Sequence, residues 1–154
     1  MTLLEFLHFH QQFKRLLASP AIPDIISLIG LEKATHKQIR YFSSGMKQRV
    51  KLAQAVFSDA PVLLLDEPCT NLDAEGVALY QQLITTYCKN RLIIVSSNDE
   101  MEYTFCSEQL NINNYATHAK KTIRDTSPRR CFTAIAARKV LSDLKYLPCT
   151  FRQY

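Results

Sequence analysis

The chain has 154 residues, 47% of them hydrophobic and 10% aromatic, which excludes a wholly disordered protein and predicts one domain with its own core. The net charge of +5 is uneven, because residues 116–154 carry nine Lys or Arg against two Asp and leave −2 on residues 1–115. Five widely spaced Cys without a CxxC pair argue against a disulfide framework or zinc site. The first residues do not resemble a signal peptide and no apolar run reaches bilayer length, so we expect a cytoplasmic protein.

Two helices are predicted near the N-terminus. Thr2 and Glu5 form a capping box, and apolar residues at helical spacing extend the first helix to about residue 18. Its apolar positions are Phe6, Phe9, Phe13 and Leu16. Pro23 can open a second, short helix that Gly30 closes.

A third helix is predicted to begin just after Gly45, because Met46, Val50, Ala53 and Phe57 fall on one helical face. The turn Ser43, Ser44 and Gly45 then lies at the helix N-terminus. Free N–H groups, hydroxyls and the positive end of the helix dipole suit a phosphate there. The alternative is an ordinary N-cap turn.

Residues 61–73 read PVLLLDEPCTNLD, an aliphatic run that predicts a short strand buried on both faces and ending in two carboxylates. Adjacent carboxylates repel each other unless a cation, a donor or solvent meets them. Asp66 can hold Mg²⁺, and Glu67 can orient or deprotonate a water for attack on a phosphoryl group. The alternative is a solvated strand end without a function.

Asp73 is predicted to cap a helix whose Val77, Tyr80, Ile84 and Tyr87 share one side. Residues 91–97 then read as a second buried strand, parallel to the first through a βαβ crossover. One or two helical turns and a weak strand at 109–115 follow.

The basic tail, residues 116–154, is predicted to be helical or disordered. Ser127 and Pro128 can start an amphipathic helix with Phe132, Ile135, Val140 and Leu144 roughly on one face. Binding of nucleic acid by this tail is a weaker alternative, and no specific nucleic acid is expected.

Three segments in fixed order resemble motifs of the ATP-binding cassette (ABC) family. FSSGMKQR (42–49) resembles its signature, VLLLDEP (62–68) its Walker B strand and TNLD (70–73) its D-loop. SSND (96–99) falls where the family has a switch histidine, and Asn98 stands at that position. The resemblance covers about residues 1–113.

The resemblance implies an α/β fold, a partial P-loop NTPase-type parallel sheet with an α-helical subdomain at the N-terminus. Residues 1–45 are expected to form the helical subdomain that carries the signature. Residues 46–115 are expected to form the C-terminal part of the ATPase core, and residues 116–154 the basic tail.

The resemblance also implies an ATP-binding subunit of an ABC transporter, peripheral on the cytoplasmic face of the membrane, with ATP and Mg²⁺ as cofactors. Its partners would be a membrane-spanning permease and a second nucleotide-binding domain, in a homodimer or heterodimer. The implied roles are phosphate contact in trans for Ser43, Ser44 and Gly45, Mg²⁺ binding for Asp66, catalysis for Glu67, the D-loop link for Asp73 and the switch position for Asn98.

Departures from the family pattern limit these expectations. Ser44 and Met46 replace usual signature residues, and Asn98 cannot carry the charge of a protonated His. The sequence contains only three Gly and no G-x-x-x-x-G-K-[ST] loop, so it resembles the part of a cassette that follows the Q-loop. We therefore expect little ATP hydrolysis by the isolated chain, and poor solubility or obligate pairing. The alternative is an inactive fragment or an interaction protein that pairs with a complete cassette.

Overall fold

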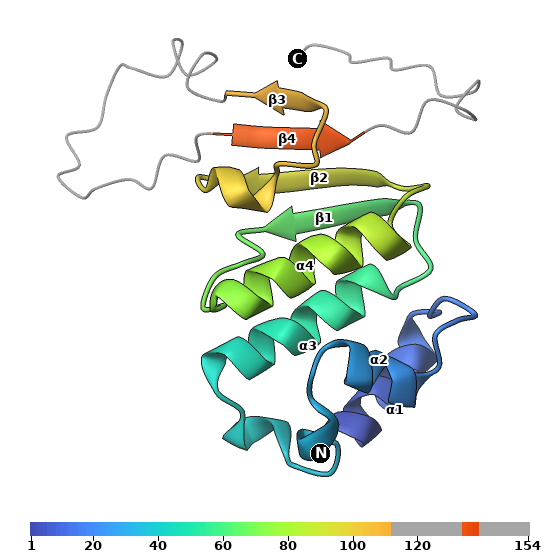
Figure 1. The fold of residues 1–154 in the computed structure, drawn as a ribbon. Coiled ribbons are helices and arrows are strands. Elements are labelled where there is room, and N and C mark those ends of the chain that lie inside the picture. Colours follow the sequence, from blue (N-terminus) through green and yellow to red (C-terminus); the bar gives the residue numbers. More distant parts are fainter. Residues whose placement is uncertain (112–133, 139–154) are drawn as a thin grey trace, which may run out of the picture.

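The computed structural model describes residues 1–111 and 134–138. Figure 1 shows a mixed α/β arrangement with a sheet at one end, α1 and α2 at the other, and α3 and α4 between them. In the part of the chain described, no helix is long and apolar enough to cross a membrane. The helices are α1 (Leu3–Phe13), α2 (Ile22–Leu28), α3 (Ser44–Val56) and α4 (Ala74–Tyr87), with 3-10 turns η1 (Glu32–Ala34), η2 (Ile39–Tyr41) and η3 (Glu100–Glu102).

The sheet has the strand order β1-β2-β4-β3 (Figure 1). Strand β1 pairs with β2 in parallel, whereas β4 is antiparallel to both β2 and β3. The crossover from β1 to β2 runs through α4, which confirms the predicted βαβ unit. The strands are β1 (Val62–Asp66), β2 (Leu92–Ser97), β3 (Glu108–Leu110) and β4 (Ala134–Arg138).

Helix α1 has the predicted capping box but is shorter than predicted. The Thr2 hydroxyl accepts from the Glu5 amide, and the Glu5 carboxylate accepts from the Thr2 amide. The prediction that the helix runs to about residue 18 is wrong, because the chain turns away after Phe13 and the Leu17 amide donates to the Phe57 carbonyl over 2.8 Å. The buried face is formed by Leu3 and Leu7, whereas Phe13 is 75% exposed.

Helix α2 begins within one residue of Pro23, as predicted, whereas α3 begins at Ser44, two residues before its predicted start. Pro23 lies in the first turn of α2, and Gly30 after its end has a φ of +68°, a left-handed conformation that glycine adopts without strain. Helix α3 has Ser43 as its N-cap, so its first turn includes Gly45 instead of following it. Its buried face includes Val50 and Ala53, as the periodicity predicts.

Strand β1 is buried on one face only, and the prediction of burial on both faces is wrong. Leu63 and Leu65 point into the core that α3 and α4 share with the sheet, whereas Leu64 is 69% exposed. Strand β1 also lies at one edge of the sheet, with β2 as its single neighbour among the described strands. Aliphatic surface of this kind is typical of a sheet face that another segment covers.

The C-terminal elements differ most from the predictions. The helical turn after β2 is the short 3-10 turn η3, and the weak third strand is β3, which starts one residue early. Residues 134–138 form β4, so the predicted tail helix is wrong over that range, which includes Ile135. The backbone of β4 pairs with β2 on one side and with β3 on the other, and these hydrogen bonds stabilise the strand instead of a helix. Phe132, Val140 and Leu144 lie outside the described residues.

Neighbouring leucines in β1 allow a matched test of this packing. Leu65→Ala removes a buried side chain and should lower the free energy of unfolding by about 2–4 kcal/mol. Leu64→Ala trims an exposed side chain and should change it by less than about 0.5 kcal/mol. Urea unfolding followed by circular dichroism measures both. Equal losses in the two variants would contradict the one-sided burial of β1.

Candidate functional site

The turn at the start of α3 presents polar groups to solvent. Ser43 is the N-cap, and its hydroxyl accepts from the Met46 amide over 3.2 Å. Ser43 and Ser44 are exposed. The first amides of a 13-residue helix therefore point toward the same solvent region as two hydroxyls. Sequence reasoning placed this turn correctly, and its geometry suits an anionic ligand.

The turn that leads into α4 packs directly against the start of α3. A side chain at Gly45 would place its Cβ 3.0 Å from the Asn71 carbonyl oxygen, which explains why a glycine stands there. Asn71 itself has a φ of +65°, a left-handed conformation that Asn tolerates. Together these turns line a cleft of about 550 Å³, whose polar residues include Ser43, Ser44, Arg49 and Asp73.

Asp73 is fixed at the N-terminus of α4, as predicted. Its Oδ1 atom accepts from the Gly76 amide over 2.8 Å, and Arg49 Nη2 lies 3.4 Å from the same oxygen. The hydrogen bond from Gly76, assisted by the charge of Arg49, lowers the pKa of the Asp73 carboxyl. Arg49 also donates to the Ile29 carbonyl, so it ties α2, α3 and the α4 cap together.

Asp66 and Glu67 lie at the C-terminal end of β1. Asp66 is exposed and Glu67 is half-buried, and neither forms an ion pair with another described residue. The Glu67 amide donates to the Ser96 carbonyl over 2.9 Å, which continues the pairing of β1 with β2. Both carboxylates line a cleft of about 360 Å³ together with Gln48 and Lys51 of α3. They are therefore available to a ligand.

The backbone at Glu67 adopts an uncommon conformation. Its φ of +41° is unusual for a residue with a side chain, and conformations of this kind often occur at functional sites. The Thr70 amide donates to the Glu67 carbonyl over 3.1 Å, and the Thr70 hydroxyl lies 3.4 Å from Glu67 Oε2. This tight turn places the carboxylate directly after the end of β1, where it lines two clefts.

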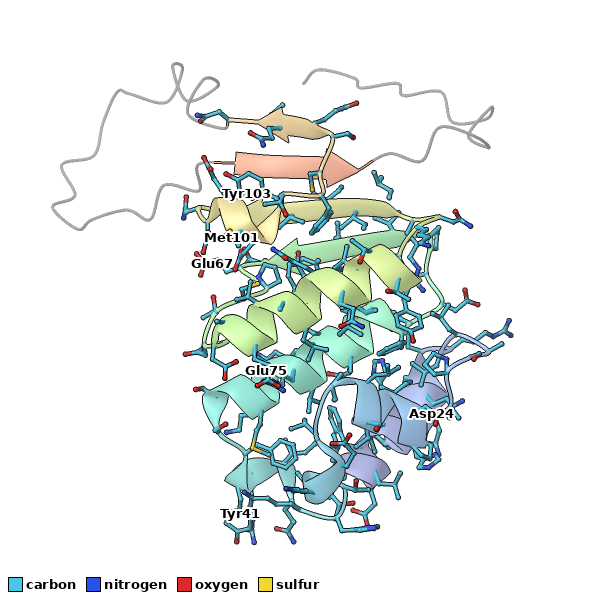
Figure 2. All side chains as sticks on the ribbon, in the orientation of Figure 1. Asp24, Tyr41, Glu67, Glu75, Met101 and Tyr103 are labelled. Atoms are coloured by element: carbon cyan, nitrogen blue, oxygen red, sulfur yellow. The ribbon has the colours of Figure 1, made fainter. Side chains whose placement is uncertain are left out.

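Asn98 follows β2 and lies at the same edge of the sheet. It is exposed and lines a cleft of about 370 Å³ together with Glu67, Thr70 and Glu102. Figure 2 shows Glu67 at this edge, beside Met101 of η3 and Tyr103, which follows η3, whereas Asp24 lies on α2, far from the sheet. The parallel strands thus bring Asp66, Glu67 and Asn98 together.

Three clefts form one continuous stretch of surface. Asn71 lines both the Ser43 cleft and the Asp66 cleft, and Glu67 lines both the Asp66 cleft and the Asn98 cleft. Within the described residues no group of three His, Cys, Asp or Glu side chains could enclose a metal ion. Mg²⁺ is usually bound by one or two carboxylates, with phosphate oxygens and water at its other coordination positions. The two carboxylates at the end of β1 fit this pattern.

Sequence reasoning missed several residues that hold this surface together. Gln48 Nε2 donates to the Pro68 carbonyl over 2.8 Å, and Glu102 accepts from the Cys69 amide over 2.7 Å. Both contacts join residues at least 20 positions apart, so no local pattern could reveal them. Burial raises the pKa of the neighbouring Cys69 thiol to about 12, which makes it a poor nucleophile.

Comparisons with known proteins give consistent results. Residues 4–70 match the family model described as ABC transporter. An ABC transporter ATP-binding protein of Bacillus subtilis, YybJ, is 36% identical over 104 residues, covering 66% of this chain and 48% of that protein. The cytochrome c biogenesis ATP-binding export protein CcmA of Xylella fastidiosa is 36% identical over 87 residues, covering 56% of this chain and 39% of that protein.

A solved structure supports the fold. A chain in the crystal structure of the complex of archaeal ribosomal stalk protein aP1 and archaeal ribosome recycling factor aABCE1 matches with a TM-score of 0.50 and 18% identity. The match covers 67% of this chain and 22% of that chain.

This chain spans about half or less of the length of the two curated relatives, YybJ and CcmA.

The lowered pKa of Asp73 predicts a pH-dependent contribution to stability. A carboxyl whose pKa is lower in the folded state stabilises that state above the ordinary pKa of about 3.9, and the contribution is lost as pH falls through the folded-state pKa. Asp73→Asn keeps the cap oxygen but loses the charge, so it should melt at a lower temperature than the wild type at pH 7 and at the same temperature in strong acid. Melting curves across pH test this, and equal melting temperatures at pH 7 would contradict it.

Proposed function

The chain carries part of the ATPase domain of an ABC transporter, and from this premise we propose that it is an ATP-binding subunit. It would supply the two carboxylates to one ATP site, the signature turn in trans to a second ATP site, and the D-loop turn that links the two. The observation that carries the proposal is the continuity of the three clefts. Asn71 links the Ser43 cleft to the carboxylates, and Glu67 links the carboxylates to Asn98.

The signature turn would bind the γ-phosphate of an ATP held mainly by another nucleotide-binding domain. Ser43, Ser44 and Gly45 combine exposed hydroxyls with the amides of the first turn of α3, and an anion gains from both. The absence of a side chain at Gly45 also keeps α3 close to the Asn71 carbonyl. Asp73, fixed by Gly76 and Arg49, would link the two sites across the pair.

Asp66 and Glu67 would divide the remaining roles. Asp66 is exposed and is suited to hold Mg²⁺. A bound Mg²⁺ would stabilise the negative charge on the transferred phosphoryl group. Glu67 would orient the attacking water and accept its proton, with Thr70 restraining the carboxylate and Asn98 donating a hydrogen bond to phosphate. Positioning is the main contribution of protein groups to phosphoryl transfer.

The wider assembly follows from the same proposal. A membrane-spanning permease and a second nucleotide-binding domain would be the partners, which would place the chain at the cytoplasmic face of the membrane. Residues 1–45 would serve as the helical subdomain, residues 46–115 as part of the ATPase core and residues 116–154 as a basic extension, although β4 joins residues 134–138 to the sheet.

Binding of Mg·ATP is testable by hydrogen exchange. Millimolar Mg·ATP should slow amide exchange in peptides that cover residues 43–46 and 66–72, because they line the proposed phosphate-binding and metal-binding surfaces. Asp66→Ala should lose the magnesium-dependent part of this protection. Asp24→Ala is the matched control, since Asp24 is an exposed acid on α2, away from the clefts. Mass spectrometry measures the exchange.

Two outcomes would count against the proposal. One is unchanged exchange in both peptides at saturating Mg·ATP, and the other is equal protection in Asp66→Ala and the wild type. Phosphate release gives a second readout, because the sequence contains no phosphate-gripping loop and we expect wild type and Glu67→Gln to be equally slow. Turnover that disappears in Glu67→Gln would show that this chain grips the triphosphate without another domain.

A further inference from the structure

Glu102 is a buried acid behind the proposed site. It lies in η3, the turn that follows β2, and only 4% of its surface is exposed. Its Oε1 atom accepts from the Cys69 amide over 2.7 Å, a short hydrogen bond of the charge-assisted kind. Its Oε2 atom is also buried, and the carboxyl group interacts with the Ser97 side chain. Burying a carboxylate in this way is costly, so a role beyond packing is worth testing.

The backbone around Glu102 is held firmly. Its carbonyl accepts from the Tyr80 hydroxyl over 2.8 Å, which fastens η3 to α4. Its amide donates to the Asp99 carbonyl, and the Asp99 side chain accepts from the Met101 amide. Burial, together with the negative charges of Asp99 and Glu67, raises the pKa of the Glu102 carboxyl. The Cys69 amide therefore meets a carboxyl group on a backbone that is held by α4 and by the N-cap of η3.

The Cys69 amide belongs to the turn that carries Glu67. The Thr70 amide donates to the Glu67 carbonyl, and the Leu72 amide donates to the Cys69 carbonyl. The Cys69 amide has no acceptor within this turn and depends on Glu102 instead. Glu67, with its φ of +41°, needs surroundings that hold it in an unfavourable conformation. Glu102 supplies one of these restraints from outside the turn.

Glu102 also joins the turn to the switch position. Glu67, Asn98 and Glu102 line the same cleft, and Asn98 lies two residues before the first residue of η3. A shift of the segment after β2 would move Glu102, and the hydrogen bond to Cys69 would pass that shift to the turn. The coupling needs a side chain long enough to reach across the cleft, which is a testable property.

We propose that Glu102 is a positioning residue that holds the Glu67 turn in place and couples it to the segment containing Asn98 through the hydrogen bond to the Cys69 amide. The functional part of this inference rests on the proposed role of Glu67, whereas the hydrogen bond and its structural effect do not. Glu102 contacts no reacting atom, so its effect on the ATP site would be indirect.

Two conservative variants separate reach from charge. Glu102→Gln keeps an acceptor oxygen at the same distance along the side chain, whereas Glu102→Asp keeps the charge but is one methylene too short for the Cys69 amide. Glu100→Ala is the matched control, because Glu100 is an exposed acid in the same turn. All four proteins, including the wild type, are compared by residue-resolved hydrogen exchange with and without millimolar Mg·ATP.

Glu102→Asp should speed exchange of the Cys69 amide by about tenfold and weaken the Mg·ATP protection of residues 66–72. Glu102→Gln and Glu100→Ala should resemble the wild type in both readouts. A merely structural role would lower the melting temperature without a selective loss of protection at residues 66–72.

Three results would overturn the inference. The Cys69 amide could exchange in Glu102→Asp as slowly as in the wild type, or it could exchange in Glu102→Gln as fast as in Glu102→Asp. The third is that Glu102→Asp keeps the full Mg·ATP protection of residues 66–72 although its Cys69 amide exchanges fast. Failure of the proposed function is distinguishable, because the wild type itself would then show no Mg·ATP protection. In that case the exchange at Cys69 would still decide whether Glu102 holds the turn, and the coupling to ATP would be rejected.

Discussion

The parallel pairing of β1 with β2 brings the ends of two strands to one edge of the sheet, and the position of the acidic side chains depends on it. Asp66 pairs with Ser96, and the hydrogen bond from the Glu67 amide to the Ser96 carbonyl extends the pairing by one residue. A shift of one residue in this register would exchange the faces of the strands and would bury Leu64 instead of Leu65. The same shift would carry Glu67 away from Asn98.

Contacts on both sides then fix the turn between β1 and α4. On the side of α3, Gln48 holds the Pro68 carbonyl and Arg49 holds Asp73. On the side of η3, Glu102 holds the Cys69 amide. The chain therefore places an N-terminal helical segment, a strand end and the segment after β2 around one short turn. Such an arrangement is suited to phosphate chemistry because preorganised groups need little rearrangement when charge develops.

Local patterns predicted the parts of this structure that local physics determines. The Thr2 capping box, the Ser43 and Asp73 caps and the βαβ crossover follow from short-range hydrogen bonds and hydrophobic periodicity, and the structure contains each of them. The signature, strand-end and D-loop residues could be singled out because their order is distinctive. Their roles in binding ATP stay predictions.

Long-range packing determines what the sequence could not reveal. The end of α1 depends on a backbone hydrogen bond to Phe57, and Leu64 is exposed because no described segment covers its face of the sheet. Residues 134–138 read AIAAR, which is compatible with a helix or a strand. They form the strand β4 because they pair with β2 and β3. Glu102 was missed because its partner is 33 residues away.

The central claim is that Asp66 holds the metal of Mg·ATP next to the catalytic Glu67, and metal-directed cleavage of the backbone tests it most directly. Fe²⁺ replaces Mg²⁺ in the presence of ATP, and ascorbate with peroxide then generates radicals that cut the chain next to the bound metal. We expect ATP-dependent cuts close to residues 66–67 that disappear in Asp66→Ala and remain in Asp24→Ala. Cuts at another place, or cuts that persist unchanged in Asp66→Ala, would contradict the account.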